Sequence, residues 1–253
     1  GIAVILDVVY NHATGQNPYY RMWNTDNGGY GGKATTDSPF FNPDATHSYS
    51  VFNDFNHSKQ ATRDYVKRTV QYWIDEYKID GFRWDLTKGF TQNCTDSDQN
   101  CTNQEQADRV AVLKTYADYQ WEVDNDFYVI FEHLGTNQEE TQWVNYRLGE
   151  GKGIMVWGNH NGNYSEATIG YHDAGKSDFS WISYKNRGWT VPANVSYMES
   201  HDEERLMYKN LEFGNSSGSY TIKNLATALD RMELAGAFYF TVPGPKMIWQ
   251  FGE

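Results

Sequence analysis

The feature that most constrains the fold of this sequence is a series of short apolar runs, rich in β-branched residues, separated by segments of helical character. Parallel strands need crossover connections of a dozen residues or more, so this alternation is typical of a parallel α/β sheet. We therefore predict an α/β fold in which these runs form the strands. The runs cover residues 2–9, 79–84, 128–131, 154–157, 195–198 and 246–249.

Helical periodicity is clearest between the first two runs, where apolar residues recur every three or four positions. A second helix is predicted around residues 113–121, and a third over 222–235 with Gly236 available near its end. The apolar face of the first helix consists of Val66, Val70, Trp73, Ile74 and Tyr77.

Residues 13–57 break this rhythm, because they are rich in Gly, Asn, Asp and Pro and carry aromatic residues without a clear period. Connections of this length in compact domains are usually functional or form a small subdomain. We expect an insertion that overhangs a site.

Composition and charge narrow the possible partners. With 39% hydrophobic and 16% aromatic residues the chain is too apolar to be disordered, and its net charge of −12 disfavours nucleic acid and anionic membranes. The longest nearly unbroken apolar stretch, 234–240, is far short of the ~20 residues that cross a bilayer. Neither nucleic acid nor a membrane span is expected.

Two cysteines, Cys94 and Cys101, lie in a polar stretch that predicts a surface loop. They form either a small disulfide or a pair of free thiols, and a disulfide would favour an exported protein, extracellular or periplasmic. Because the first apolar run follows Gly1 directly, we expect the chain to be internal to a longer protein.

Charged residues cluster where four of the apolar runs end, which is where parallel α/β folds bind their ligands. On a strand, Arg83 and Asp85 share one face, so the arginine favours an ionised Asp85. An ionised Asp beside a Glu of raised pKa is what glycoside cleavage through a covalent intermediate requires. The four clusters are Asp7-Val-Val-Tyr-Asn-His12, Gly81-Phe-Arg-Trp-Asp85, Phe131-Glu132-His133 and Tyr197-Met-Glu-Ser-His-Asp202.

In this order, the four clusters resemble the four signature regions of the α-amylase superfamily of glycoside hydrolases (family 13 type), and residues 244–253 resemble its last barrel strand. The resemblance, closest to α-amylases, implies a (β/α)8 TIM barrel of which strands 3 to 8 are present. Its domain B corresponds to residues 13–57. The first two strands are missing, which would leave open sheet edges.

The resemblance also implies roles for individual residues. Asp85 matches the nucleophile, Glu132 the general acid/base and Asp202 the third carboxylate, which steadies the distorted sugar. Further matches are the substrate-binding residues, namely His12, Arg83 and His201 at the cleaved glucosyl unit and Lys88 on the leaving-group side. Asp7 resembles the strand-end aspartate that supports Arg83.

A calcium ion is the cofactor that the resemblance implies, with Asn11, Asp54 and the backbone carbonyl of Gly89 as ligands. Asn11 and Asp54 could instead make turn hydrogen bonds. Ser200 and Gly89 depart from the family's usual Asn and His. Trp157 and the aromatic residues of the insertion are the preferred sugar-stacking platforms, since flat rings suit the apolar faces of pyranoses.

Three functions remain open at this point. The first is retaining endo-hydrolysis of α-1,4-glucosidic bonds in starch, glycogen or maltooligosaccharides. The second is α-glucan transglycosylation of the branching or glucanotransferase type, which the products from maltoheptaose would distinguish. The third is a non-catalytic glucan-binding relative or inactive fragment, which predicts loss of a carboxylate, whereas Asp85, Glu132 and Asp202 are all present.

Overall fold

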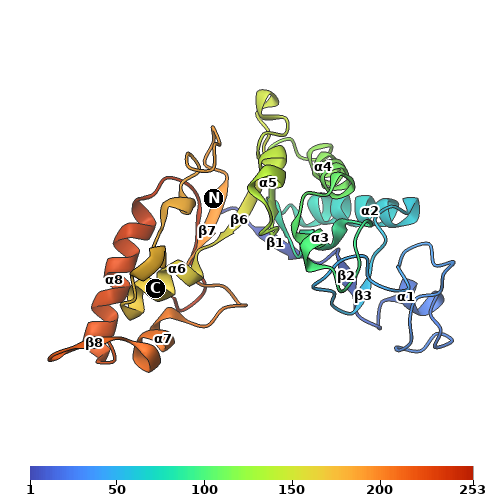
Figure 1. Ribbon diagram of the computed structural model, residues 1–253. Coiled ribbons are helices and arrows are strands. Elements are labelled where there is room, and N and C mark those ends of the chain that lie inside the picture. Colours follow the sequence, from blue (N-terminus) through green and yellow to red (C-terminus); the bar gives the residue numbers. More distant parts are fainter. Residues whose placement is uncertain (253) are drawn as a thin grey trace. The chain divides into compact units, whose positions relative to one another are not determined.

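The computed structural model describes residues 1–252, so Glu253 lies outside the described residues. The chain divides into two compact units, Gly1–Val156 and Trp157–Glu253, and strand β6 (Met155–Asn159) crosses the boundary between them. Both units alternate strands with helices along the chain (Figure 1). Each is described separately below.

The first unit contains parallel strands β1 (Ile5–Val8), β4 (Gly81–Trp84) and β5 (Tyr128–Phe131), followed by β6. Their register sets Asp7 opposite Arg83 on the neighbouring strand. The predicted strand at 128–131 is confirmed in full, whereas β1 is shorter than the apolar run over 2–9. This register brings the strand-end clusters of β1, β4 and β5 to one edge of the sheet.

Two long helices, α2 (Gln60–Tyr77) and α4 (Ala107–Trp121), pack against each other in this unit (Figure 1). Val66, Val70 and Ile74 of α2 are buried as predicted, but Tyr77 is exposed because the helix ends there, with Lys78 left-handed at φ 52°. The shorter elements are η1 (Thr87–Phe90), α3 (Gln99–Asn103), α5 (Asn137–Val144) and η2 (Leu148–Glu150).

The insertion is closed at its base by a short antiparallel pair, β2 (His12–Ala13) and β3 (Asn53–Asp54), and contains one short helix, α1 (Pro18–Met22). Its remaining backbone is largely irregular, as the Gly-rich and Asn-rich composition predicts. A core of its own holds the segment together, formed by Tyr20, Ala34, Phe41 and Phe55.

The second unit pairs strands β7 (Asn194–Tyr197) and β10 (Lys246–Met247) in parallel. The prediction that its long helix, α8 (Leu225–Thr241), ends near Gly236 is wrong. The helix continues because Gly236 is tolerated in its interior, and it stops before Val242, which precedes Pro243 and is extended. The other elements are α6 (Asn161–Ile169), α7 (Leu206–Phe213), η3 (Asp173–Gly175), η4 (Ser180–Ile182), β8 (Ser216–Ser217) and β9 (Tyr220–Thr221).

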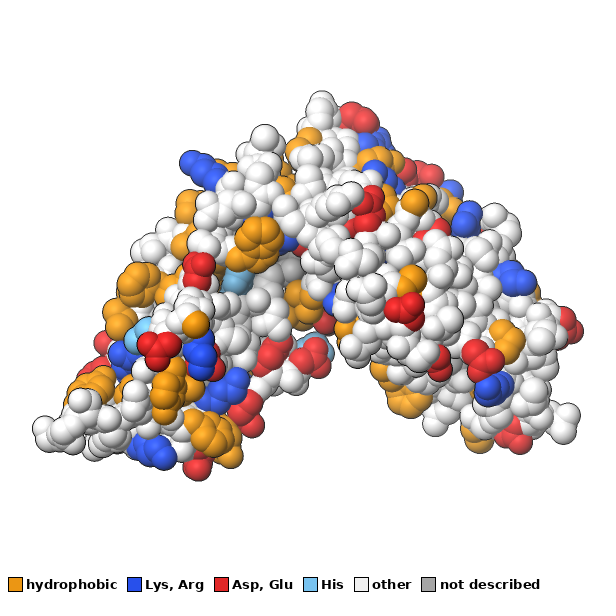
Figure 2. Space-filling model, viewed as in Figure 1, with side chains coloured by type: hydrophobic (Ala, Val, Ile, Leu, Met, Phe, Trp, Pro, Cys, Tyr) orange, Lys and Arg blue, Asp and Glu red, His pale blue; other side chains and the backbone are white. Residues whose placement is uncertain are grey.

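Cys94 and Cys101 form a disulfide, with their Cα atoms 5.7 Å apart, which confirms the bonded alternative. The bridge closes the loop from which α3 emerges. Apolar side chains are visible on the surface of both units (Figure 2), and those of α8 include Leu225, Leu229 and Phe238. Within residues 1–252, no helix combines the length and hydrophobicity that a membrane crossing needs.

Candidate active site

The centre of the candidate site is Arg83 of β4, a residue that is only 5% exposed. Its Nη1 atom donates to Asp7 Oδ1 at 2.7 Å and to Asp85 Oδ1 at 2.8 Å. Its Nη2 atom lies 2.8 Å from Glu132 Oε2. One guanidinium therefore contacts three carboxylates that reach it from the ends of β1, β4 and β5.

The backbone explains why these side chains converge. Hydrogen bonds continue past the strand ends, from Asp85 N to Val8 O at 2.9 Å and from Glu132 N to Trp84 O at 3.0 Å. Residues that follow neighbouring parallel strands are thereby kept in register. The predicted meeting of Asp7, Arg83, Asp85 and Glu132 is present in the structure.

The guanidinium of Arg83 keeps its positive charge although it is buried. Burial lowers the pKa of Arg83, but Glu132, Asp7 and Asp85 together raise that pKa above its ordinary value. The arginine thus stays charged and can donate charge-assisted hydrogen bonds to the carboxylates around it. The side chains of Asp85 and Glu132 remain 21% and 11% exposed, so a substrate can reach both.

A turn after Asp85 joins the two candidate catalytic carboxylates. Leu86 adopts a left-handed backbone, with φ 45°, and its N–H donates to Glu132 Oε2 at 2.9 Å. The next residue, Thr87, donates to the backbone oxygen of Glu132 through both N at 3.0 Å and Oγ1 at 2.8 Å. A left-handed non-glycine residue costs roughly 1–2 kcal/mol, so contacts with Glu132 hold this turn in place.

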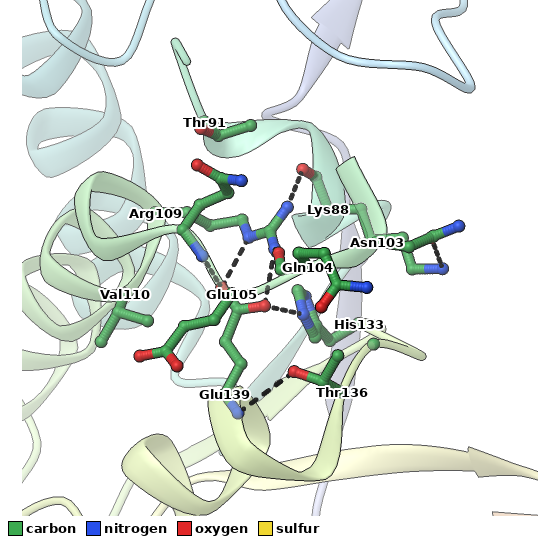
Figure 3. A network of polar contacts seen from close by, with 12 residues as sticks. Lys88, Thr91, Asn103, Gln104, Glu105, Arg109, Val110, His133, Thr136 and Glu139 are labelled. Atoms are coloured by element: carbon green, nitrogen blue, oxygen red, sulfur yellow. Dashed lines mark hydrogen bonds and ion pairs between the residues drawn. The ribbon is translucent and has the colours of Figure 1, made fainter. Parts of the chain in front are cut away.

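A buried ionic network lies behind this turn (Figure 3). Arg109 donates to both carboxylate oxygens of Glu139, at 2.8 and 2.6 Å, and His133 Nε2 lies 2.9 Å from Glu139 Oε2. Arg109 also donates to the backbone oxygen of Lys88 at 2.7 Å, while His133 Nδ1 lies 3.2 Å from Thr87 Oγ1. The network therefore supports the segment that carries Lys88.

The protonation of this network follows from its burial. Burial raises the pKa of Glu139, but His133 and Arg109 outweigh that effect and lower the pKa below its usual value. For His133, burial lowers the pKa more than Glu139 raises it. The network thus consists of an ion pair between Arg109 and Glu139 with a neutral His133 beside it.

Sequence reasoning missed Arg109 and Glu139. The only local signal was the capping-box spacing of Thr136 and Glu139, which marks a helix start. Thr136 does cap α5, but the Glu139 side chain turns to Arg109 and His133 instead of the cap.

Two predicted substrate-binding residues lie near this centre. His12 is half-buried, and burial lowers its pKa despite the opposing charge of Asp85. Lys88 is also half-buried; its Nζ donates to Asn103 Oδ1 at 3.0 Å, and burial lowers its pKa.

The second unit holds the remaining predicted residues. His201 Nε2 lies 3.4 Å from Asp202 Oδ1, and both side chains are exposed, at 42% and 59%. Trp157 is buried, with its ring centroid 5.1 Å from Tyr197 and 6.4 Å from His201. The role of Trp157 as a sugar platform stays a prediction.

The predicted calcium ligands lie between the insertion and the end of β4. Asn11 Oδ1 is buried and has no hydrogen-bond partner among residues 1–252, and a Cβ atom on Gly89 would lie 1.9 Å from it. Asp54 Oδ1 lies 3.1 Å from His47 Nε2, and Asp54 Oδ2 accepts from Asn42 at 2.7 Å. An unpaired buried amide oxygen is the kind of ligand that a hard cation takes, so calcium at Asn11, Asp54 and Gly89 stays a prediction.

No cluster of three or more His, Cys, Asp or Glu side chains that could hold a metal occurs in the part of the chain that the structure describes. The candidate calcium site has a different composition, because it relies on an amide and a backbone carbonyl besides Asp54.

The fold defines the class of protein, a partial β/α barrel like that of solved α-amylase and pullulanase structures. An α-amylase from Geobacillus thermoleovorans, solved with acarbose, superposes with a TM-score of 0.68 at 16% identity and covers 100% of this chain and 50% of its own. A pullulanase from Anoxybacillus sp. LM18-11, solved with maltotetraose, gives a TM-score of 0.62 at 18% identity over 99% of this chain and 34% of its own. The predicted partial TIM barrel is confirmed.

The family model described as "Alpha amylase, catalytic domain" matches residues 46–253. The chain belongs to the α-amylase family of glycoside hydrolases. It is 34% identical to the isoamylase SU1 of Zea mays over 99 residues, which are 38% of this chain and 12% of that protein. A glycogen operon protein GlgX homolog of Mycobacterium tuberculosis is 27% identical over 80% of this chain and 27% of its own length. The chain thus spans a minor part of these relatives.

Proposed function

We propose that this chain carries the catalytic portion of a retaining endo-hydrolase of α-1,4-glucosidic bonds in starch, glycogen and maltooligosaccharides. The observation that supports this proposal most directly is the contact of Asp85 and Glu132 with the two terminal nitrogens of one arginine, Arg83. A retaining glycosidase needs two carboxyl groups flanking one bond, about 5–5.5 Å apart.

In the proposed first step, an ionised Asp85 attacks the anomeric carbon and forms a covalent glycosyl intermediate, while Glu132 donates a proton to the departing sugar oxygen. In the second step, Glu132 takes a proton from water, which hydrolyses the intermediate. Arg83 supports this assignment because its Nη1 atom donates to Asp85 Oδ1 at 2.8 Å and orients that carboxylate.

The other residues would bind and distort the sugar. His12 and His201 are proposed to hold the glucosyl unit at the cleaved bond, and Asp202 to stabilise its distorted ring. Lys88 is proposed to hold the first sugar on the leaving-group side. Loss of Lys88 should weaken binding more than it changes the chemistry, whereas loss of Asp202 should lower kcat because this carboxylate acts on the distorted ring.

Calcium is proposed as a structural ion that Asn11, Asp54 and the carbonyl of Gly89 would hold. The cation would supply a charge that ties the insertion to the segment after β4. The unpaired buried oxygen of Asn11 supports the assignment.

The disulfide between Cys94 and Cys101 supports an exported location, because disulfides persist in oxidising compartments.

A second candidate is cleavage of α-1,6 branch points, which is favoured by similarity to the isoamylase SU1 of Zea mays and, at 32% identity over 90 residues, to a pullulanase of Bacillus subtilis. Transglycosylation on the same residues is the third.

The test is to incubate the protein with maltoheptaose and with pullulan and to follow product length and anomeric configuration by NMR. Shorter α-anomers from maltoheptaose are expected. Cleavage of pullulan alone, products longer than maltoheptaose, or β-anomers would contradict the proposal.

A further inference from the structure

The stretch after β7, which carries His201 and Asp202, is closed by a neighbouring carboxylate. Ser200 Oγ donates to Glu203 Oε2, and the N–H of Asp202 donates to Ser200 Oγ at 3.2 Å. The other carboxylate oxygen, Glu203 Oε1, accepts from Asn159 Nδ2 at the end of β6. One half-buried carboxylate of the second unit therefore binds both this stretch and the end of the neighbouring strand.

Ser200 explains why a carboxylate is needed here. It stands where the α-amylase family usually has Asn, and its hydroxyl has one proton to donate, whereas an amide has two. The residue is only 2% exposed, and a buried hydroxyl needs a hydrogen-bond partner. Glu203 accepts that proton, so the lone pairs of the hydroxyl are left to receive the N–H of Asp202.

The ends of the stretch are joined by separate contacts. Glu199 accepts from Leu206 N at 2.7 Å and from Arg205 Nη1 at 2.9 Å. Neither contact reaches Asp202. Within residues 1–252, the hydrogen bond to Ser200 is the one that holds the Asp202 backbone, so the orientation of Asp202 depends on how Ser200 is held.

We propose that Glu203 is a positioning residue for Asp202, which it orients through the hydroxyl of Ser200. The inference rests on the proposed function, in which Asp202 stabilises the distorted sugar ring, and adds Glu203 and Ser200 to it. A group that acts on a transition state must be held within a fraction of an ångström of its productive place. Loss of the positioning residue should therefore lower kcat and leave KM nearly unchanged.

The test compares two adjacent glutamates. Glu203→Ala removes the acceptor of Ser200, and kcat on maltoheptaose should fall about tenfold while KM stays within about twofold. Glu203→Gln keeps the shape but leaves one acceptor oxygen for two donors, so its loss should be smaller.

Glu204→Ala is the matched control. Glu204 is exposed and also accepts from a backbone N–H, that of Arg205 at 2.9 Å, but within residues 1–252 it bonds to neither Ser200 nor Asp202. Its kcat should stay within about twofold of wild type. Circular dichroism of each variant verifies that the fold is retained.

A second measurement shows whether Glu203 acts through Asp202. In an Asp202→Asn background, Glu203→Ala should lower kcat by less than about twofold, because the carboxylate that it orients is already lost. A further tenfold loss in that background would overturn the proposal. So would an unchanged kcat in Glu203→Ala, or equal losses in Glu203→Ala and Glu204→Ala.

Failure of the proposed function is a separate outcome, reached if the wild-type protein cleaves neither maltoheptaose nor pullulan. Hydrogen exchange of the Asp202 amide, followed by NMR, then decides the positioning alone. Exchange should be faster in Glu203→Ala than in wild type and unchanged in Glu204→Ala, because the acceptor of this N–H loses its own partner only in the first variant. Equal exchange in Glu203→Ala and wild type would overturn the role of Glu203.

Discussion

The two units hold their candidate site residues in different ways. In the first unit, Asp85 and Glu132 share Arg83, and buried groups such as Arg109 and Glu139 stand behind them. In the second unit, His201 and Asp202 contact each other on an exposed stretch after β7. The comparison shows that the proposed nucleophile and acid/base are held by charge and burial, whereas the proposed residues of the second unit lie on a more open stretch.

The largest expected effect tests the chemistry at Arg83. Asp85→Asn removes the nucleophile but keeps its shape, so kcat on maltoheptaose should fall by several orders of magnitude. The variant should also lose stability, because Arg83 stays buried with one fewer partner. Asp202→Asn should reduce kcat while changing the free energy of unfolding by less than about 0.5 kcal/mol, since its side chain is exposed.

Steady-state kinetics and urea unfolding of both variants provide the measurement. The assignment of Asp85 as nucleophile is wrong if Asp85→Asn keeps more than about a tenth of wild-type kcat.

The second prediction compares one ion pair in each unit. Glu139→Gln breaks a pair in which both side chains are fully buried, which should cost about 3–5 kcal/mol. Glu199→Gln breaks the pair with Arg205, whose side chain is 31% exposed, and should cost about 1 kcal/mol. Chemical denaturation measures both changes, and equal costs would contradict the contrast between the units.

Removal of calcium should affect the first unit. If Asn11, Asp54 and Gly89 hold the ion, EDTA should lower the stability of the protein by about 3 kcal/mol at a hundredfold excess of calcium over Kd. Asn11→Ala should abolish this response, whereas Asn163→Ala in the second unit should preserve it. Calorimetric melting with and without EDTA is the measurement, and an unchanged Tm in wild type would mean that these residues only form turns.

The smallest effect concerns pH. Burial lowers the pKa of His160 in the second unit from 6.5 to about 4, with Arg187 and Lys246 adding to the shift. His160 binds a proton more tightly in the unfolded chain than in the folded one. The contribution of the neutral His160 to stability is therefore fully present above pH 6.5 and is lost as the pH falls toward 4. A loss of roughly 1–3 kcal/mol is expected.

His160→Gln removes the ionisation and can still pair with Asn194, the neighbour of the His160 ring. Urea titrations between pH 7 and 4 should show a flatter dependence in this variant. If the free energy of unfolding changes with pH equally in the variant and the wild type, His160 is not the group responsible.

Much of the first unit could be predicted because its signals are local. Apolar runs mark the strands, and the two-residue spacing of Arg83 and Asp85 places both on one face. The resemblance of the four ordered clusters to the α-amylase family then gave Glu132 as the second carboxylate. The buried side of α2 followed from its periodicity in the same way.

The rest depends on partners that are distant in sequence. Arg109 and Glu139 are 30 positions apart on different helices, and Asn159 and Glu203 are 44 apart, so neither pair leaves a local pattern. The extent of α8 was missed for a different reason. A glycine in a helix costs only about 1 kcal/mol, which packing along the helix can outweigh.

The absence of a side chain at residue 89 has a consequence for sequence variation. A Cβ atom there would lie 1.9 Å from Asn11 Oδ1 and 2.6 Å from His47 Nε2, so a single substitution collides with two other segments of the chain. An alanine or histidine at this position therefore requires the side chain of Asn11 or His47 to move. In related sequences, positions 11, 47 and 89 should therefore covary, and a side chain introduced at position 89 alone should lower the free energy of unfolding.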